Sequence, residues 1–221
     1  MSRSRWPHAF FASAAFYAMV GVSWGLAMGM TKNHATYSAH AHLNLLGWLS
    51  LAAVLGNVLL WLSSFAGAWL VQAQLQVLND WLGVALVLLG CYLLLQLKQL
   101  AEARFNAQGL QRPVWTMVLF SMLFEGGMLL LGAPSGELDW PLLLSLAGVF
   151  VLGCISLWLG ICLLRVENVY PSFRLMAWLD IAGGVMLMSL LLAMLAPLPL
   201  IGALLAQMLL FFRVAAELQE G

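Results

Sequence analysis

The sequence predicts an all-α polytopic membrane protein, a transmembrane helical bundle of about seven helices. Of its 221 residues, 63% are hydrophobic and 8% are charged, whereas an average soluble domain has roughly 25% charged residues. Apolar runs of about 18 residues or more are long enough to cross a bilayer, and they recur along the whole chain. No segment is polar enough to form a soluble domain, so residues 1–221 are expected to form a single integral membrane domain.

Seven segments are expected to span the membrane, and polar or proline-containing breaks separate them. They are 9–30, 42–62, 74–97, 114–132, 141–164, 175–195 and 199–214. The segment from Lys98 to Pro113 is expected to be the one strongly polar loop. A-P-S-G-E-L-D-W-P closes the fourth helix, Arg165 to Arg174 separates the fifth from the sixth, and A-P-L-P separates the last two. Backbone groups in lipid must be hydrogen-bonded internally, which favours helices throughout.

The distribution of basic residues favours one orientation of a seven-helix chain. Arg3 and Arg5 would then lie on one side, and the other side would hold Lys32, Lys98, Arg104, Arg112, Arg165, Arg174 and Arg213. Because basic residues are enriched in cytoplasmic loops, the larger group would face the cytoplasm. If 61–78 formed an additional short helix, the count would be eight and the histidines described below would lie on the opposite face of the membrane. The sequence leaves both arrangements open.

Three glycines form a stripe on the first expected helix. Gly21, Gly25 and Gly29 are spaced four apart, so another backbone could approach closely along this face. Helix packing, including a homo-oligomer through this face, is one interpretation. A groove for a flat cofactor is the other.

Three of the four histidines lie in the stretch T-K-N-H-A-T-Y-S-A-H-A-H-L-N-L-L-G-W, from Thr31 to Trp48. If His40 and His42 are both helical, they point about 200° apart and serve two partners on opposite faces of one helix. Alternatively, His40 lies in a preceding loop and folds back. Asn44 shares the face of His40, and Gly47 is expected to leave room beside that face. Neutral imidazole is a good ligand for haem iron, copper or zinc, so His34, His40 and His42 are candidate cofactor ligands.

The motif A-H-A-H-L-N-L-L-G-W resembles the H-x-H helix of the haem–copper oxidase superfamily. It is most similar to short bacterial membrane proteins described as cytochrome c oxidase subunit I-like. In that superfamily the two histidines ligate two different haems from opposite helix faces, and the resemblance assigns these roles to His40 and His42. It further implies a multi-pass protein of the bacterial inner (cytoplasmic) membrane, with membrane lipid and other respiratory or oxidase subunits as partners.

The rest of the chain departs from a complete oxidase. Four histidines are fewer than the roughly six that two haems and a copper need in that family, and there is no H-x-x-x-Y element. Where short relatives carry a further histidine, this chain has L-N-D-W, with Asn79 and Asp80. If the chain is an enzyme, it is therefore an oxidoreductase component. The expected function is a haem-binding redox, gas-sensing or accessory protein rather than a terminal oxidase by itself.

A copper-handling or oxidase-assembly protein without haem is the alternative. Met28, Met30 and His34 precede the H-x-H pair, and thioether and imidazole ligands together suit Cu(I). Methionines also commonly fill gaps between helices, which is the structural interpretation of the same residues.

Two carboxylates, Glu125 and Asp180, lie within expected spans and are candidates because ionisable groups at membrane depth are often functional. Glu125 is assigned either to a proton path or to a structural bond, and Asp180 to an interhelical hydrogen bond. Zero formal net charge argues against a nucleic-acid partner, which would require a basic patch.

Overall fold

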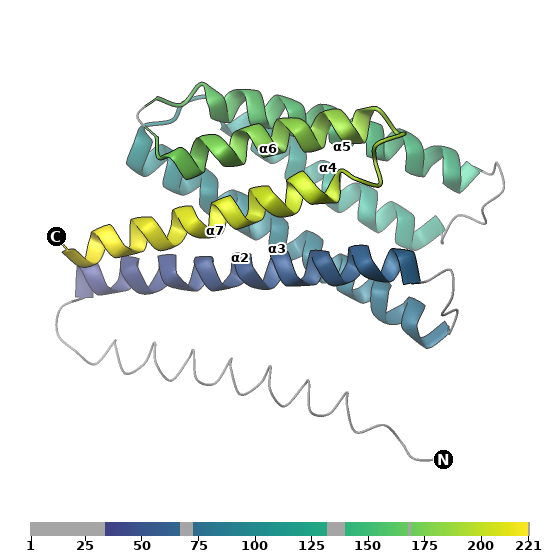
Figure 1. Cartoon of the computed structure of the whole chain (residues 1–221), viewed down its shortest axis with the longest axis horizontal. Helices are drawn as coiled ribbons and strands as arrows, with labels where there is room; N and C mark the ends of the chain where they lie inside the picture. Colours follow the sequence, from purple (N-terminus) through teal and green to yellow (C-terminus); the bar gives the residue numbers. More distant parts are fainter. Residues whose placement is uncertain (1–33, 67–72, 132–139, 168, 221) are drawn as a thin grey trace, which may run out of the picture. The chain divides into compact units, whose positions relative to one another are not determined.

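The computed structural model describes residues 34–66, 73–131, 140–167 and 169–220, and these residues form six helices (Figure 1). The helices are α2 (His34–Ala66), α3 (Ala73–Phe105), α4 (Gln111–Leu131), α5 (Trp140–Leu164), α6 (Pro171–Met188) and α7 (Pro197–Glu220). No strand occurs in these residues, which confirms the all-α class. The described count is six rather than the expected seven. The first expected helix, 9–30, lies outside the described residues.

Five of the six helices are long and apolar enough to cross a membrane: Ala41–Ser63, Asp80–Phe105, Gln111–Leu131, Trp140–Leu164 and Pro197–Leu218. The chain is therefore a multi-pass membrane protein whose apolar helix surfaces contact lipid. The remaining helix, α6, has 18 residues and carries Arg174 and Asp180, which lower its apolar character. It nevertheless lies against α5 along much of its length.

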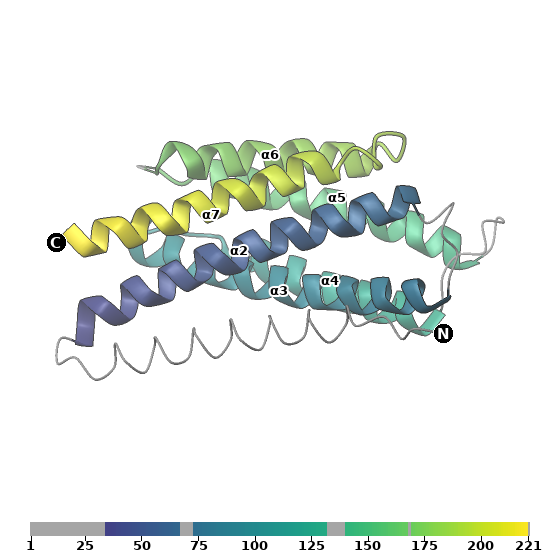
Figure 2. The ribbon, with the colours of Figure 1, turned by 60° about the horizontal axis from the view of Figure 1, so that its bottom comes forward.

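The chain divides into two units, and each is described by itself. One comprises Met1–Leu45 with Arg213–Gly221, and the other comprises Leu46–Phe212. In the second unit, α3 is adjacent to α4, α4 to α5 and α5 to α6. Successive helices run in opposite directions, as the views in Figures 1 and 2 show. The second unit is therefore an up-and-down bundle.

Glycines set the closest approach in this bundle, between α5 and α6. A methyl group at Gly153 would lie 2.7 Å from the carbonyl oxygen of Gly184 and 2.8 Å from the backbone nitrogen of Met188. Reciprocally, a methyl group at Gly184 would lie 2.8 Å from the carbonyl oxygen of Gly153 and from the nitrogen of Leu157. A methyl group at Gly160 would likewise lie 3.0 Å from the carbonyl oxygen of Ala177. The two backbones are thus in direct contact, as expected for small residues at membrane helix interfaces.

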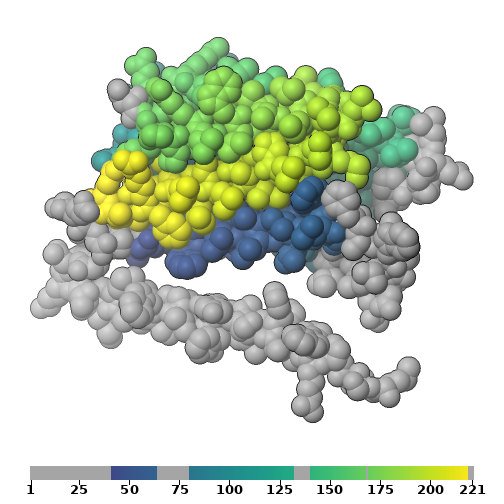
Figure 3. Space-filling view, in the orientation of Figure 1, coloured from purple at the N-terminus to yellow at the C-terminus, as the bar shows by residue number. Residues whose placement is uncertain are grey.

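The last helix closes the bundle by packing against α6, α2 and α3. Leu200 of α7 fills the space above Gly183, and Leu179 of α6 lies over Gly202. Figure 3 shows α7 between α6 and α2 on one face of the second unit.

Two hydrogen bonds join α3 to α7, and α2 to the turn that precedes α7. Gln207 of α7 is buried and donates through Nε2 to the Leu93 carbonyl of α3 at 3.0 Å. At one end of the bundle the Trp61 indole of α2 donates to the Met194 carbonyl at 3.1 Å. Trp48 meets Phe212 at the other end, so α2 and α7 are antiparallel over this region.

Several expected boundaries are wrong. The segment 98–105, expected to be loop, is the last two turns of α3, where Lys98 and Glu102 form an i,i+4 ion pair of 2.8 Å. The connection to α4 begins at Asn106 in the left-handed conformation (φ 50°), and the Ala107 amide donates to the Ala101 carbonyl. The described residues of 61–78 do not form a separate helix. Residues 61–66 are the end of α2, and residues 73–78 are the start of α3.

The sixth helix ends earlier than expected, at Met188 rather than residue 195. Ser189 Oγ accepts a hydrogen bond from the Leu192 amide at 3.1 Å, and Leu190 takes a left-handed φ of 53°. The side chain of Ser189 therefore competes with the helical pattern, as serine does at helix ends. Pro197 then begins α7 at the first helical position, where its missing N–H costs nothing.

Candidate functional site

The histidine stretch lies at the start of α2. The helix begins at His34 and continues unbroken for 33 residues, so His34, His40 and His42 all have helical backbones. This excludes the alternative in which His40 sits in a loop. The side chains of His34 and His40 lie outside the described residues, whereas His42 is exposed and Asn44 is half-buried.

Helical geometry separates the three imidazoles. Taking His34 as the reference, His40 points about 240° and His42 about 80° around the helix axis. Three side chains spread in this way cannot converge on one ion from a single helix. His40 and His42 can instead each face a different neighbour, which is the arrangement expected from their spacing.

Gly47 does not leave room beside the face of His40, contrary to the expectation. A methyl group at Gly47 would lie 2.6 Å from Cε1 of Phe212, so the Phe212 ring already occupies this space. The ring also contacts Trp48 edge-to-face, with centroids 5.9 Å apart. A planar group bound to this face would have to lie on the N-terminal side of Gly47.

Polar side chains farther along α2 are bonded to their own helix. Ser50 is fully buried and donates to the Leu46 carbonyl at 2.9 Å. Asn57 donates through Nδ2 to the Ala53 carbonyl at 2.8 Å. These i,i−4 bonds satisfy the Ser50 and Asn57 donors within α2 itself.

The two carboxylate candidates lie on different helices. Glu125 of α4 faces α3, where its Oε1 would be 3.1 Å from a methyl group at Gly83. An interhelical hydrogen bond is present near Asp180. Ser156 Oγ of α5 donates to the backbone carbonyl oxygen of Asp180 in α6 at 3.0 Å. The Asp180 carboxylate is thus not the group that joins α5 to α6 in this bond.

Metal-binding groups of three or more His, Cys, Asp or Glu are absent from the described residues. The methionines of the copper alternative, Met28 and Met30, and the stripe of Gly21, Gly25 and Gly29 lie outside the described residues. The three cysteines, Cys91, Cys154 and Cys162, are free.

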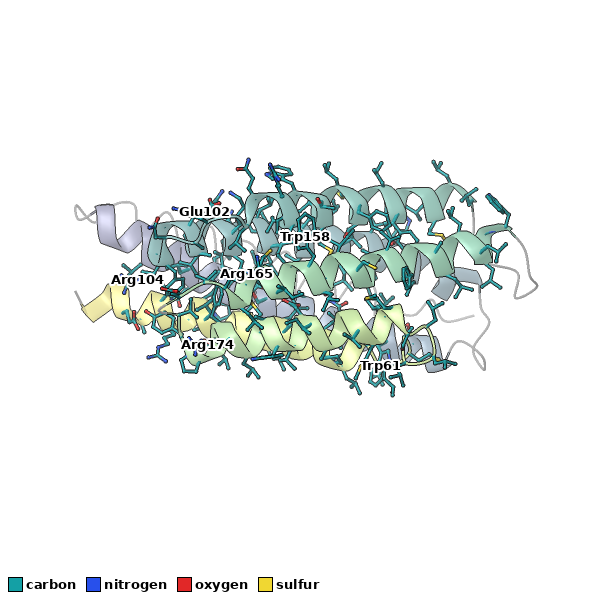
Figure 4. The ribbon with its side chains drawn as sticks, turned by 90° about the horizontal axis from the view of Figure 1, so that it is seen from above. Trp61, Glu102, Arg104, Trp158, Arg165 and Arg174 are labelled. Carbon is teal, nitrogen blue, oxygen red and sulfur yellow. The ribbon has the colours of Figure 1, made fainter. Side chains whose placement is uncertain are left out.

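A group of arginines gathers at one end of the second unit. Arg104 near the end of α3, Arg165 directly after α5 and Arg174 in the first turn of α6 lie at the same end, with Trp61 at the other (Figure 4). The aromatic rings of Phe105, Tyr170 and Phe173 join these helix ends, with centroid distances of 5.4 and 5.6 Å from Phe105. The charge count placed these arginines on one side of the membrane, but their gathering in space depends on the helix packing.

Comparison with known protein families, with curated proteins and with solved structures finds no match for this chain.

Proposed function

We propose that this chain is a haem-binding protein of the bacterial inner membrane, related to haem–copper oxidase subunit I, with a redox, gas-sensing or accessory role. The observation that carries the proposal is the unbroken α2, which begins at His34. It gives His40 and His42 a common helical backbone and therefore opposite directions. One helix can then offer imidazoles to two separate planar groups.

The chemistry of the donor set fits haem better than a compact metal site. A haem takes one imidazole on each face of its ring plane, so it needs no cluster of ligands on one helix. Among the described residues, His42 is exposed on α2. When bound, haem supplies electron transfer or binding of a diatomic gas. The role of the chain's own residues is to hold the iron through imidazole nitrogen and to exclude water with apolar helix surfaces.

A second ligand for each haem would come from elsewhere, because the opposite directions of His40 and His42 give each haem one imidazole from α2. His34, His8, a methionine or a residue of a partner subunit are the candidates. A partner among respiratory or oxidase subunits agrees with an accessory role.

A spectroscopic experiment tests the proposal. The full chain is expressed with added haem precursor, purified in detergent and examined by reduced-minus-oxidised absorption. We expect a Soret band in the wild type that is lost or shifted in His42→Ala. The matched control is Gln99→Ala, an exposed polar residue on α3, which should leave the band unchanged.

The same sample separates the copper alternative from the haem proposal. Metal analysis that finds copper without a Soret band would replace haem by copper. Unchanged Cu(I) affinity after replacing Met28, Met30 and His34 together would then exclude those ligands. A Soret band that persists unchanged in His42→Ala would remove His42 from the ligand set.

A further inference from the structure

The α5–α6 pair presents one continuous apolar face that ends in two arginines. On α5, Trp158 and Ile161 precede Arg165 by seven and four residues, which places them on one stripe of the helix. On α6, Trp178 follows Arg174 by four residues and lies beside it for the same reason. Trp158 is 41% exposed and Trp178 is 60% exposed, so both stripes lie on the surface of the described chain.

The two stripes lie on the same side of the helix pair. Gly160 of α5 and Ala177 of α6 mark the line along which the two helices touch. Around the axis of α5, Arg165 lies about 140° from Gly160. Around the axis of α6, Arg174 lies about 60° from Ala177, in the same rotational sense. Because the helices are antiparallel and face each other, turns in the same sense bring side chains to the same side. Figure 4 shows the two arginines at the same end of this pair.

Neither arginine is neutralised by the described part of the chain. Ion pairs in the described residues include Lys98 with Glu102 and Arg213 with Glu217, each within one helix. Arg165 and Arg174 are exposed and form no ion pair with a described residue. The aromatic contacts of Tyr170 and Phe173 with Phe105 hold the connection between the two helices in place.

We propose that Arg165 and Arg174 form a binding site for the phosphate of an anionic phospholipid. The guanidinium groups bind the headgroup phosphate, for which their planar geometry is suited. The acyl chains lie along the stripes that carry Trp158, Ile161 and Trp178. Trp178 lies one turn from Arg174, near the helix end, where tryptophan is typical of the membrane interface. Basic residues between helix ends are typical of sites for anionic lipid headgroups. This inference does not depend on haem binding.

The test measures lipid binding by the delipidated full chain in detergent, using native mass spectrometry with phosphatidylglycerol and phosphatidylcholine. A basic residue near an anionic surface contributes about fivefold in affinity, so Arg165→Gln with Arg174→Gln is expected to weaken phosphatidylglycerol binding about 25-fold. The matched control is Arg112→Gln, an exposed arginine at the start of α4, which should retain wild-type affinity. Size-exclusion elution confirms that each variant remains folded.

Three outcomes would overturn the proposal. The first is equal affinity of the wild type for the two lipids. The second is a loss in Arg112→Gln as large as in the double variant, which would indicate a diffuse effect of charge. The third is competition by inorganic phosphate as effective as that by phosphatidylglycerol, which would show that the acyl chains are not bound.

Discussion

Replacing Gly184 with alanine should push α5 and α6 apart and destabilise the protein. The added methyl group would lie 2.8 Å from both the Gly153 carbonyl oxygen and the Leu157 nitrogen. Ordinary contacts require about 3.4 Å or more, so the two backbones would have to separate by roughly 0.6 Å. Both obstructing atoms belong to the backbone, and no side-chain rotation can relieve the contact.

The expected magnitude follows from two opposing effects. Overpacking a close contact costs about 1–3 kcal/mol, whereas alanine is favoured over glycine within a helix by about 0.8–1.0 kcal/mol. We expect Gly184→Ala to lower the free energy of unfolding by about 1–2 kcal/mol, because the contact is rigid. For a chain of this size, that corresponds to a fall in melting temperature of roughly 2–8 °C.

The matched control is Gly90→Ala on α3, where an added methyl group meets nothing within 4 Å. This variant gains helix propensity without a new contact and should be as stable as the wild type or more so. Thermal unfolding of both variants in detergent, followed by circular dichroism, provides the comparison. If Gly184→Ala melts at or above the temperature of Gly90→Ala, the close approach of α5 and α6 is incorrect.

Three other predictions follow from particular contacts. Gly109 has φ 84°, so Gly109→Ala should cost about 1–2 kcal/mol in thermal unfolding; an unchanged melting temperature would contradict the turn geometry. Gln207→Leu removes the buried bond to the Leu93 carbonyl and should cost about 1 kcal/mol, and a stabilised variant would show that this bond contributes nothing. In a cysteine-free background, Glu167→Cys should react with an impermeant thiol reagent from the cytoplasmic side and Ser189→Cys from the opposite side; labelling from one side alone would refute the helix order.

Helix existence could be predicted from composition and apolar length, but helix ends could not. The apolar run of the fifth helix was expected at 141–164 and is observed at Trp140–Leu164, because its breaks coincide with the ends of the hydrogen-bonded helix. In α3 the end of the apolar run and the end of the helix do not coincide. The helix continues through polar residues to Phe105, since helical hydrogen bonds and the Lys98–Glu102 pair persist outside the apolar run.

The opposite error occurred in α6. Residues 190–195 are apolar, so hydropathy alone extends the helix through them. The structure ends it at Met188 because the Ser189 hydroxyl bonds to the Leu192 amide and Leu190 adopts a left-handed conformation. Such competition depends on local hydrogen bonding, which apolar patterning does not record.

The candidate site was only partly accessible from the sequence. The angular relation between His40 and His42 follows from their spacing once both are helical, and the start of α2 at His34 supplies that condition. The filling of the space at Gly47 by Phe212 could not be predicted. The two residues are 165 positions apart in the chain (212 − 47), and their contact depends on how α7 packs against α2.

We propose that α2 binds haem through the H-x-H pair. The most direct test of this proposal is the haem content per chain, measured by the pyridine haemochrome assay after purification of wild type and of His40→Ala with His42→Ala. The proposal predicts haem in the wild type and background levels in the double variant, with both proteins eluting alike by size exclusion. Absence of haem from wild type expressed with adequate haem supply, or equal content in the double variant, would contradict it.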